Sequence, residues 1–180
     1  MDDYSTYQGA LDIFRKADCI GADENCIFGA VVDRTKSAAF KGAVAGKLAF
    51  GSVGFMIGNA IGHEIDLKAN KIYDYAHVLI NITDSGVGIM PLKGSVLTID
   101  PDKSKPDYDG FVFFQHQEIS DISIEKYMGL RDRIKTVIFT LADNSRLHFF
   151  IKMEEKSLPY QEENMNLFVQ KYQKTTDEAK

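Results

Sequence analysis

Small residues recur at every fourth position between residues 38 and 62, and only Phe50 interrupts the series. In a helix, residues four apart lie near one side, where missing side chains let a second backbone approach closely, as in the small-xxx-small contacts of membrane helices. The spacing therefore predicts helical structure over residues 36–62, in close contact with another helix or with a membrane. The series comprises Ala38, Gly42, Gly46, Gly54, Gly58 and Gly62. The contact residues that we expect are Gly42, Gly46, Phe50, Gly54, Phe55, Gly58 and Gly62.

Two arrangements of this segment fit its sequence. Gly51 and Ser52 lie at its middle, where helix propensity is poorest, so one bent helix and a tight helical hairpin are both open. The uncharged stretch from Leu48 to Gly62 is 15 residues long, which is shorter than the roughly 20 residues of a bilayer-spanning helix. The same glycines would serve a helix packed on its own chain or on a second copy, so self-association and peripheral membrane contact remain alternatives.

The composition indicates an ordered globular chain. Its 180 residues suffice for one well-buried core and are short for two. Hydrophobic residues make up 44% of the chain and charged residues 26%, with Pro at 4 positions, which separates it from disordered chains. We expect an N-terminal part over residues 1–70 and a β-rich part over residues 71–175. In the alternative, the chain is one domain in which residues 36–62 are an insertion.

The charge balance argues against a nucleic-acid partner. The formal net charge is -5, and Lys and Arg do not cluster. The chain starts with Met1, Asp2 and Asp3, whereas a secretory signal needs positive charge followed by an apolar run, so we expect a cytoplasmic protein with peripheral membrane association as an option. Cys19 and Cys26 make neither a zinc quartet nor a disulfide framework, and we expect them to be thiols that pack in the core.

Two elements are predicted ahead of the glycine-rich segment. Apolar residues at near-helical spacing predict an amphipathic helix from about Tyr4 to Asp18, which must dock on another element. An apolar run over residues 26–33 predicts a strand. The apolar stripe of the helix comprises Tyr7, Leu11, Phe14 and Ala17.

From Lys71 onward the hydrophobic period changes from helical to alternating, which predicts a β-rich half. One hairpin is expected from Val78 to Ile89 around a turn at Asp84, and further strands over residues 96–99, 111–115 and 119–124. A last hairpin turns at Asp143 and Asn144. Its inward side chains are Val137, Phe139, Leu141, Leu147, Phe149 and Ile151.

A C-terminal amphipathic helix follows the last hairpin. Ser157 is a plausible cap and Pro159 fits the first turn. We expect the helix and the last hairpin to share one core that contains Phe139, Leu147, Phe149, Phe168 and Tyr172. The buried stripe of the helix comprises Met165, Phe168, Val169 and Tyr172.

Short antiparallel strands followed by a single amphipathic helix resemble the pleckstrin-homology-like barrel, including its GRAM-type and bacterial versions. Residues 78–89 look like the early hairpin of that group, residues 118–124 like its middle strand, and residues 136–151 like its last hairpin. The resemblance covers about Lys71 to Tyr172 and consists of hydrophobicity patterns. It implies a mainly β, α+β fold, in which an antiparallel barrel is closed by the C-terminal helix, beside the N-terminal helix and the glycine-rich helical segment.

The resemblance implies a scaffold that binds phosphoinositides, peptides or proteins, without catalysis or cofactor, and it names no ligand-binding residue. In phosphoinositide-binding members, Lys and Arg near the loop between the first two strands hold the headgroup. If residues 78–83 are the first strand, that loop holds Asp84 and no base, which disfavours headgroup recognition. If residues 26–33 come first, basic residues follow and anion binding is open. Those residues are Arg34, Lys36, Lys41 and Lys47.

The metal-binding patterns are incomplete, and we expect no metal. His63 and Glu64 start like a zinc-protease motif, but no histidine follows four residues after His63. The loop that begins with Asp100, Asp102 and Ser104 starts like a calcium loop. Lys105 then stands in place of the turn glycine and Phe111 in place of the bidentate glutamate.

No catalytic residue is expected either. His77, His116 and His148 are scattered at strand positions without a paired nucleophile or carboxylate at a telling spacing. Two functions therefore stay open. The first, which we favour, is a non-enzymatic interaction module that binds a protein or peptide and uses the glycine-rich helices for self-association or membrane attachment. The second is a ligand carrier or small enzyme with a pocket beside the barrel.

Overall fold

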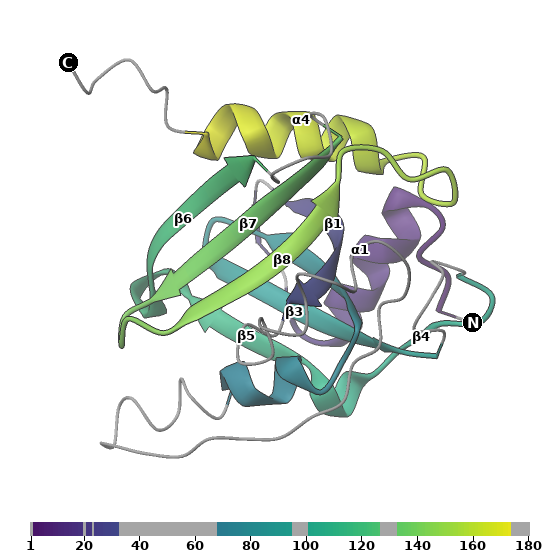
Figure 1. Cartoon of the computed structure of the whole chain (residues 1–180). Helices are drawn as coiled ribbons and strands as arrows, with labels where there is room; N and C mark the ends of the chain where they lie inside the picture. Colours follow the sequence, from purple (N-terminus) through teal and green to yellow (C-terminus); the bar gives the residue numbers. More distant parts are fainter. Residues whose placement is uncertain are drawn as a thin grey trace, which may run out of the picture.

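A computed structural model of the chain describes residues 2–19, 21–22, 24–32, 68–94, 101–126 and 133–173. The expected strand over residues 96–99 lies outside the described residues, and so does the whole glycine-rich segment. Its expected contact residues Gly42, Gly46, Phe50, Gly54, Phe55, Gly58 and Gly62 therefore remain predictions. The described residues form one antiparallel sheet with helices against it (Figure 1).

The sheet has eight strands, and all of their pairings are antiparallel. Their order is β4-β3-β2-β1-β8-β7-β6, and β5 pairs with β3 beside β4. The strand predicted from Cys26 is confirmed as β1 and lies between β2 and β8, so residues 33–67 fall in the connection from β1 to β2. The strands are β1 (Asn25–Val32), β2 (His77–Ile82), β3 (Gly86–Lys93), β4 (Lys105–Pro106), β5 (Val112–Gln115), β6 (Ile119–Lys126), β7 (Ile134–Leu141) and β8 (Arg146–Lys152).

The sheet is strongly curved but it is not a closed barrel (Figure 1). Among the described strands, β6 ends the order on one side, and β4 and β5 end it on the other. The chain crosses from β5 to β6 through the 3-10 turn η3 (His116–Glu118), and β6 then starts with a bulge between Ile119 and Asp121. The expected closed barrel is therefore wrong, because the described strands β5 and β6, which η3 joins, do not pair with each other.

The inner side of the curve holds the main core. The last hairpin and the C-terminal helix α4 (Gln161–Tyr172) meet there, as predicted: Phe139, Leu147, Phe149 and Phe168 are buried in one cluster, and Tyr172 packs against it. Helical residues 68–73 add Ala69 and Ile72 to the same cluster. In Figure 1 these helical residues and α4 lie at opposite ends of the core.

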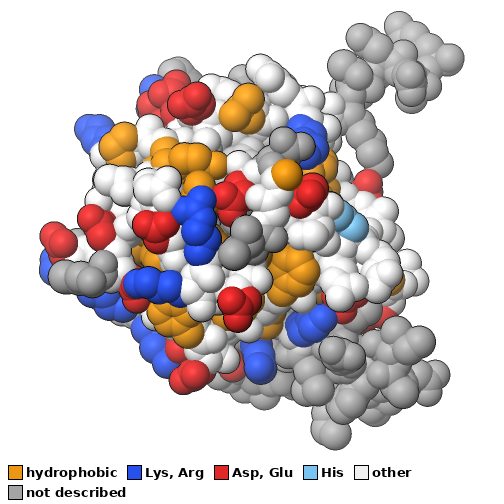
Figure 2. All heavy atoms as spheres, turned by 180° about the vertical axis from the view of Figure 1, so that it is seen from behind, with side chains coloured by type: hydrophobic (Ala, Val, Ile, Leu, Met, Phe, Trp, Pro, Cys, Tyr) orange, Lys and Arg blue, Asp and Glu red, His pale blue; other side chains and the backbone are white. Residues whose placement is uncertain are grey.

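The surface opposite the view of Figure 1 carries both signs of charge. Figure 2 shows Lys and Arg side chains interspersed with Asp and Glu on this face, with apolar side chains scattered between them. Because opposite charges lie close together, this face produces little long-range field to steer a charged partner.

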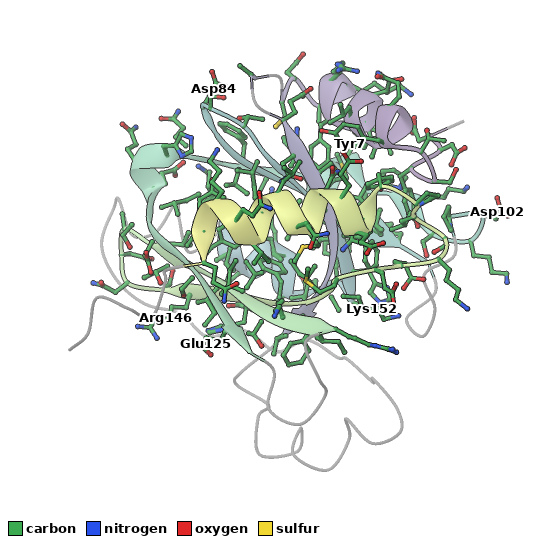
Figure 3. All side chains as sticks on the ribbon, turned by 90° about the horizontal axis from the view of Figure 1, so that it is seen from above. Tyr7, Asp84, Asp102, Glu125, Arg146 and Lys152 are labelled. Atoms are coloured by element: carbon green, nitrogen blue, oxygen red, sulfur yellow. The ribbon has the colours of Figure 1, made fainter. Side chains whose placement is uncertain are left out.

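Helix α4 begins later than the sequence predicts. Its first residue is Gln161 and no side chain caps it, whereas Ser157 instead donates from Oγ to Glu155 Oε1 at 3.4 Å. Residues 155–158 form a turn, in which Leu158 N donates to Glu155 O at 2.9 Å. The expected cap at Ser157 is therefore wrong, because its hydroxyl serves this turn. Figure 3 shows α4 lying across β1, with Tyr7 and Asp84 on one side and Glu125 and Arg146 on the other.

Two amide side chains of α4 complete the edge of β1. Strand β8 pairs with β1 only over Ala30 to Val32, so the first half of β1 lacks a strand on that side. Gln161 fills the gap: its Oε1 accepts from Phe28 N at 2.9 Å, and its Nε2 donates to Phe28 O at 3.1 Å and to Lys152 O at 2.9 Å. Asn164 Nδ2 donates to Cys26 O at 2.8 Å. These bonds hold α4 on the sheet.

The outer side of the sheet is covered by α1 (Tyr7–Lys16). Its buried face packs on Phe28, Leu79 and Met90 in a second cluster, and this explains why every residue of β2 is buried. Thr6 caps the helix by accepting from Gly9 N at 3.1 Å. The buried residues of α1 are Ala10, Leu11, Ile13 and Phe14.

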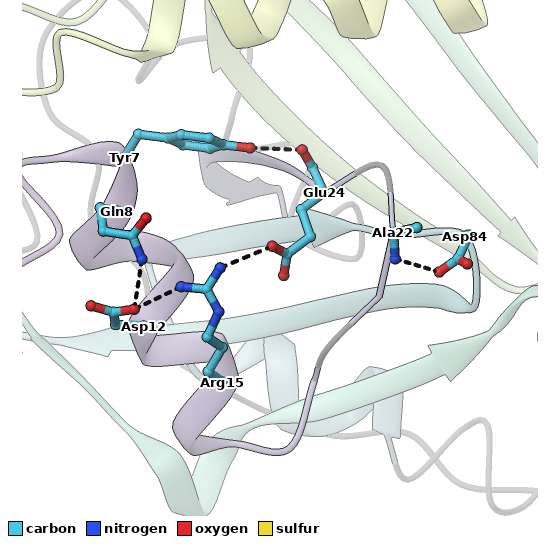
Figure 4. Close-up of polar contacts among 7 residues, drawn as sticks. All are labelled: Tyr7, Gln8, Asp12, Arg15, Ala22, Glu24 and Asp84. Atoms are coloured by element: carbon cyan, nitrogen blue, oxygen red, sulfur yellow. Dashed lines mark hydrogen bonds and ion pairs between the residues drawn. The ribbon is translucent and has the colours of Figure 1, made fainter.

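Polar contacts fix α1 and the loop after it to the sheet (Figure 4). Tyr7 donates its hydroxyl to Glu24 O at 2.6 Å, and Arg15 pairs with Glu24 at 3.3 Å. The Asp84 carboxylate accepts from Ala22 N at 2.9 Å. Asp84, which the sequence places in an acidic hairpin loop, is exposed but accepts this hydrogen bond from the same chain.

Candidate functional site

A groove of 370 Å³ runs between the start of β6 and the end of α4. Other hollows lie along α1 and the turn before α4, but this groove borders the terminal strand of the sheet. An open strand edge offers backbone donors and acceptors, which those helix and turn surfaces do not. The groove is lined by His116, Ile119, Ser120, Asp121, Ile122, Lys171, Tyr172 and Gln173.

The turn η3 sets the lower end of this groove and is held from three directions. Glu118 closes a capping box, in which its Oε2 accepts from Gln115 N at 2.8 Å. Its Oε1 also pairs with Lys68 Nζ at 2.7 Å, which ties η3 to helical residues 68–73. His116 Nε2 lies 3.1 Å from Thr83 O in the turn between β2 and β3. The mouth of the groove is therefore built on a fixed turn.

The α4 wall is anchored in the core. The rings of Phe168 and Tyr172 lie 4.8 Å apart, so the buried Phe168 fixes the tyrosine that lines the groove. Lys171 Nζ lies 5.6 Å from the centre of the Tyr172 ring. Gln173 ends the helix, and its N donates to Val169 O at 2.8 Å.

The β6 wall has the features of a protected sheet edge. Ile122 and Ile124 pack partly on the core, whereas the exposed Ser120 donates to Thr140 O at 3.1 Å. Asp121 and Glu125 alternate with the isoleucines. A bulge and edge charges discourage unspecific pairing of strands between molecules. These features protect the β6 edge against aggregation.

A second polar cluster lies at η2 (Tyr108–Gly110), between β4 and β5. Asp107 is 6% exposed and accepts from the Tyr75 hydroxyl and from Lys93 Nζ, the latter at 2.7 Å. Burial alone would raise the pKa of the Asp107 carboxyl, but the hydrogen bonds from Lys93 and Tyr75 outweigh it and lower that pKa. Burial and the same carboxylate raise the pKa of Tyr75 to about 12. The cluster is internally satisfied, and we assign it to stability.

Asp107→Asn is expected to lower the free energy of unfolding by about 1 to 2 kcal/mol at pH 7, since the bond to the exposed Lys93 is screened by solvent. Because the folded pKa is lowered, the contribution of Asp107 is present above the unfolded pKa near 3.8 and is lost as the pH falls through the lower, folded value. Urea unfolding from pH 7 to pH 3 measures this. The gap from wild type should shrink below pH 4, whereas exposed Asp109→Asn should stay near wild type; a pH-independent gap would contradict the assignment.

Burial makes the two cysteines and Asn81 unsuitable as a site. Burial raises the pKa of the Cys19 thiol to about 11 and also raises that of Cys26. Asn81 is fully buried beside Cys26 in the register, and among the described residues neither atom of its amide has a hydrogen-bond partner. All three side chains lie under α1, which closes this region to ligands.

The candidate residues named from the sequence do not converge in the described part of the chain. His77 and His148 are buried on β2 and β8, and only His116 of the three histidines lines the groove. Asp102 lies in a turn and Ser104 is buried, while His63, Glu64 and Asp100 lie outside the described residues. Within the described ranges, no three His, Cys, Asp or Glu side chains gather as a metal site would require.

The sequence predicts the helix and the strand that form the groove, but it does not predict that they lie side by side. Tyr172 belongs to the predicted stripe of the C-terminal helix and Ile119 to Ile122 lie in a predicted strand. Lys171 was not singled out, and no local signal marks it, because its role depends on which strand the end of α4 meets. Only the order of strands in the sheet supplies that information.

Comparisons with protein-family models, with curated proteins and with solved structures give no match to this chain. Among the helices of the described residues, none is both long and apolar enough to cross a bilayer.

Proposed function

We propose that the chain is a non-enzymatic interaction module that binds an extended segment of a protein partner along β6, in the groove beside α4. One observation carries this proposal: the terminal strand of the sheet borders a groove with an apolar floor and polar rims. An extended peptide can add to such an edge through main-chain hydrogen bonds, while alternate side chains enter the groove. Binding of this kind requires no catalytic group and no cofactor.

The strand connectivity supports a pleckstrin-homology-like scaffold for this module. If β4 and β5 are counted as one edge strand interrupted by η2, the chain makes an antiparallel meander whose first strand, β1, also pairs with its last, β8. A single helix then follows and packs on the sheet. A meander of antiparallel strands followed by one helix supports this proposal, although the corner at η3 is unpaired.

A ligand carrier that uses the inside of the curved sheet, as distinct from a pocket beside it, has less support. The inner side of the curved sheet is filled by buried apolar side chains, with Met165 and Phe168 of α4 at one end and Ile72 at the other. A carrier of the lipocalin kind needs an interior cavity, and here packed side chains occupy that place. An external groove suits a protein partner better.

The glycine-rich segment completes the proposal as a means of self-association or of peripheral membrane attachment in the cytoplasm. Because β1 is a strand of the sheet, this segment with its basic residues follows the first strand. This order supports anion binding by the basic residues after β1 more than headgroup binding at the turn of Asp84. The Asp84 carboxylate is itself an anion and accepts a hydrogen bond from Ala22 N.

Selection of peptides from a random display library against the full chain tests the groove. We expect selected peptides to bind as extended chains, so methylation of alternate peptide nitrogens should abolish binding. Ser120→Trp fills the groove from the β6 wall and Gln173→Trp fills it from the α4 wall, and each should weaken binding at least about tenfold by blocking a fitted contact.

The matched control is Asn166→Trp, because Asn166 is exposed on α4 and does not line the groove. It should bind the selected peptides as wild type does, and thermal melts of all three variants check that they are folded. The proposal fails if no peptide is selected, or if the selected peptides bind equally to the two groove variants and the control.

A further inference from the structure

We infer, on the basis of the proposed function, that the partner segment carries an acidic side chain that Lys171 recognises, two positions from an apolar side chain that rests on Ile119 and Ile122. The inference concerns the chemistry of the partner. It follows from the charge at the α4 rim and from the geometry of an extended chain.

Lys171 is the cation at the α4 rim of the groove. It is exposed, and among the described residues no carboxylate lies within ion-pair distance of its Nζ. The Tyr172 ring beneath it is fixed by Phe168, so the ammonium stands over an anchored surface instead of sweeping freely through solvent. A cation held at the rim of a groove favours an acidic ligand group by local charge complementarity.

The apolar floor of the groove is the basis for the apolar side chain in the expected partner segment. Ile119 and Ile122 are partly buried and line the β6 side, facing the α4 rim across the groove. In an extended peptide, residues two apart point to the same face. A peptide on β6 can therefore place an apolar side chain on the isoleucines and, two positions away, a carboxylate near Lys171.

Lys171 also stands in the last turn of α4, where a cation stabilises the helix dipole. That role would affect helix stability without affecting the choice of ligand. A charge reversal separates the two roles, because only a recognition role changes which peptides are selected.

The experiment repeats the library selection with full-length wild type, Lys171→Glu and Lys171→Arg. Wild type and Lys171→Arg should enrich Asp or Glu two positions from an apolar residue, whereas Lys171→Glu should enrich Lys or Arg there. A wild-type-selected acidic peptide should bind Lys171→Glu about fivefold more weakly, which corresponds to the upper range for an exposed ion pair. Its Gln-substituted version should bind wild type and Lys171→Glu equally.

Four results would overturn the inference. Identical sequence preferences with wild type and Lys171→Glu would show that Lys171 does not recognise a side chain of the peptide. A lower melting temperature of Lys171→Glu with unchanged preferences would show that Lys171 only stabilises the helix dipole. Peptides that Ser120→Trp blocks but that show no charge preference would overturn the inference and leave the proposed function standing. If wild type selects no peptide, both fail.

Discussion

Phe168→Ala is expected to lower the free energy of unfolding by about 3 to 5 kcal/mol, the usual cost of removing a buried phenylalanine ring. Phe168 has no exposed surface and lies in the cluster that joins α4 to the last hairpin. Its ring also supports Tyr172 at 4.8 Å, so the substitution removes an aromatic contact as well as filled volume. Urea unfolding followed by circular dichroism measures the change.

The neighbouring residue provides the control. Leu167 is 52% exposed on the same helix, and Leu167→Ala should change the free energy of unfolding by about 0.5 kcal/mol or less. If the two substitutions cost the same, α4 does not pack on the sheet as described. Phe168→Ala should also weaken binding of groove-selected peptides, because Tyr172 loses its support.

Gln161→Leu should cost about 3 kcal/mol or more, although leucine has a similar size and a higher helix propensity. Gln161 is fully buried, and its amide satisfies Phe28 N, Phe28 O and Lys152 O. Leucine leaves the buried Phe28 N and Phe28 O without this partner, and each buried unsatisfied group costs about 1 to 3 kcal/mol; the bond to Lys152 O is part-buried and adds less. Urea unfolding measures the change.

Gln170→Leu is the matched control, because Gln170 is exposed on the same helix and should tolerate the same substitution at little cost. A second variant, Gln161→Glu, keeps the acceptor for Phe28 N but loses the two donated bonds, so it should be destabilised as well. Wild-type stability in Gln161→Leu would show that the first half of β1 does not depend on α4.

Much of the fold was predictable because its elements carry strong local signals. The helix stripe at Leu11 and Phe14 and the alternation on both sides of the turn at Asn144 are local patterns, and both elements are present in the structure. Asn144 has a φ of 68°, the left-handed conformation that asparagine tolerates in tight turns. Such patterns predict an element correctly because they depend only on residues that are close in sequence.

The start of α4 was misplaced because capping depends on what else the candidate residue contacts. The hydroxyl of Ser157 is used by Glu155 in the preceding turn, and the helix instead begins at Gln161, whose amide bonds to β1. The partner at β1 is more than a hundred residues away in the chain. No local rule could identify it.

Hydrophobic periodicity and turn residues were enough to predict the β-rich class, the two flanking helices and the shared core of the last hairpin and α4. The arrangement in space was needed to show that α1 covers the outer side of the sheet, that β5 and β6 do not pair across η3, and that the end of α4 meets the edge strand β6. The two kinds of information depend on different separations along the chain. Periodicity among sequence neighbours predicts which face of an element is apolar, whereas the order of strands, which depends on distant segments, decides which faces and edges meet. The groove lies where such distant segments come together.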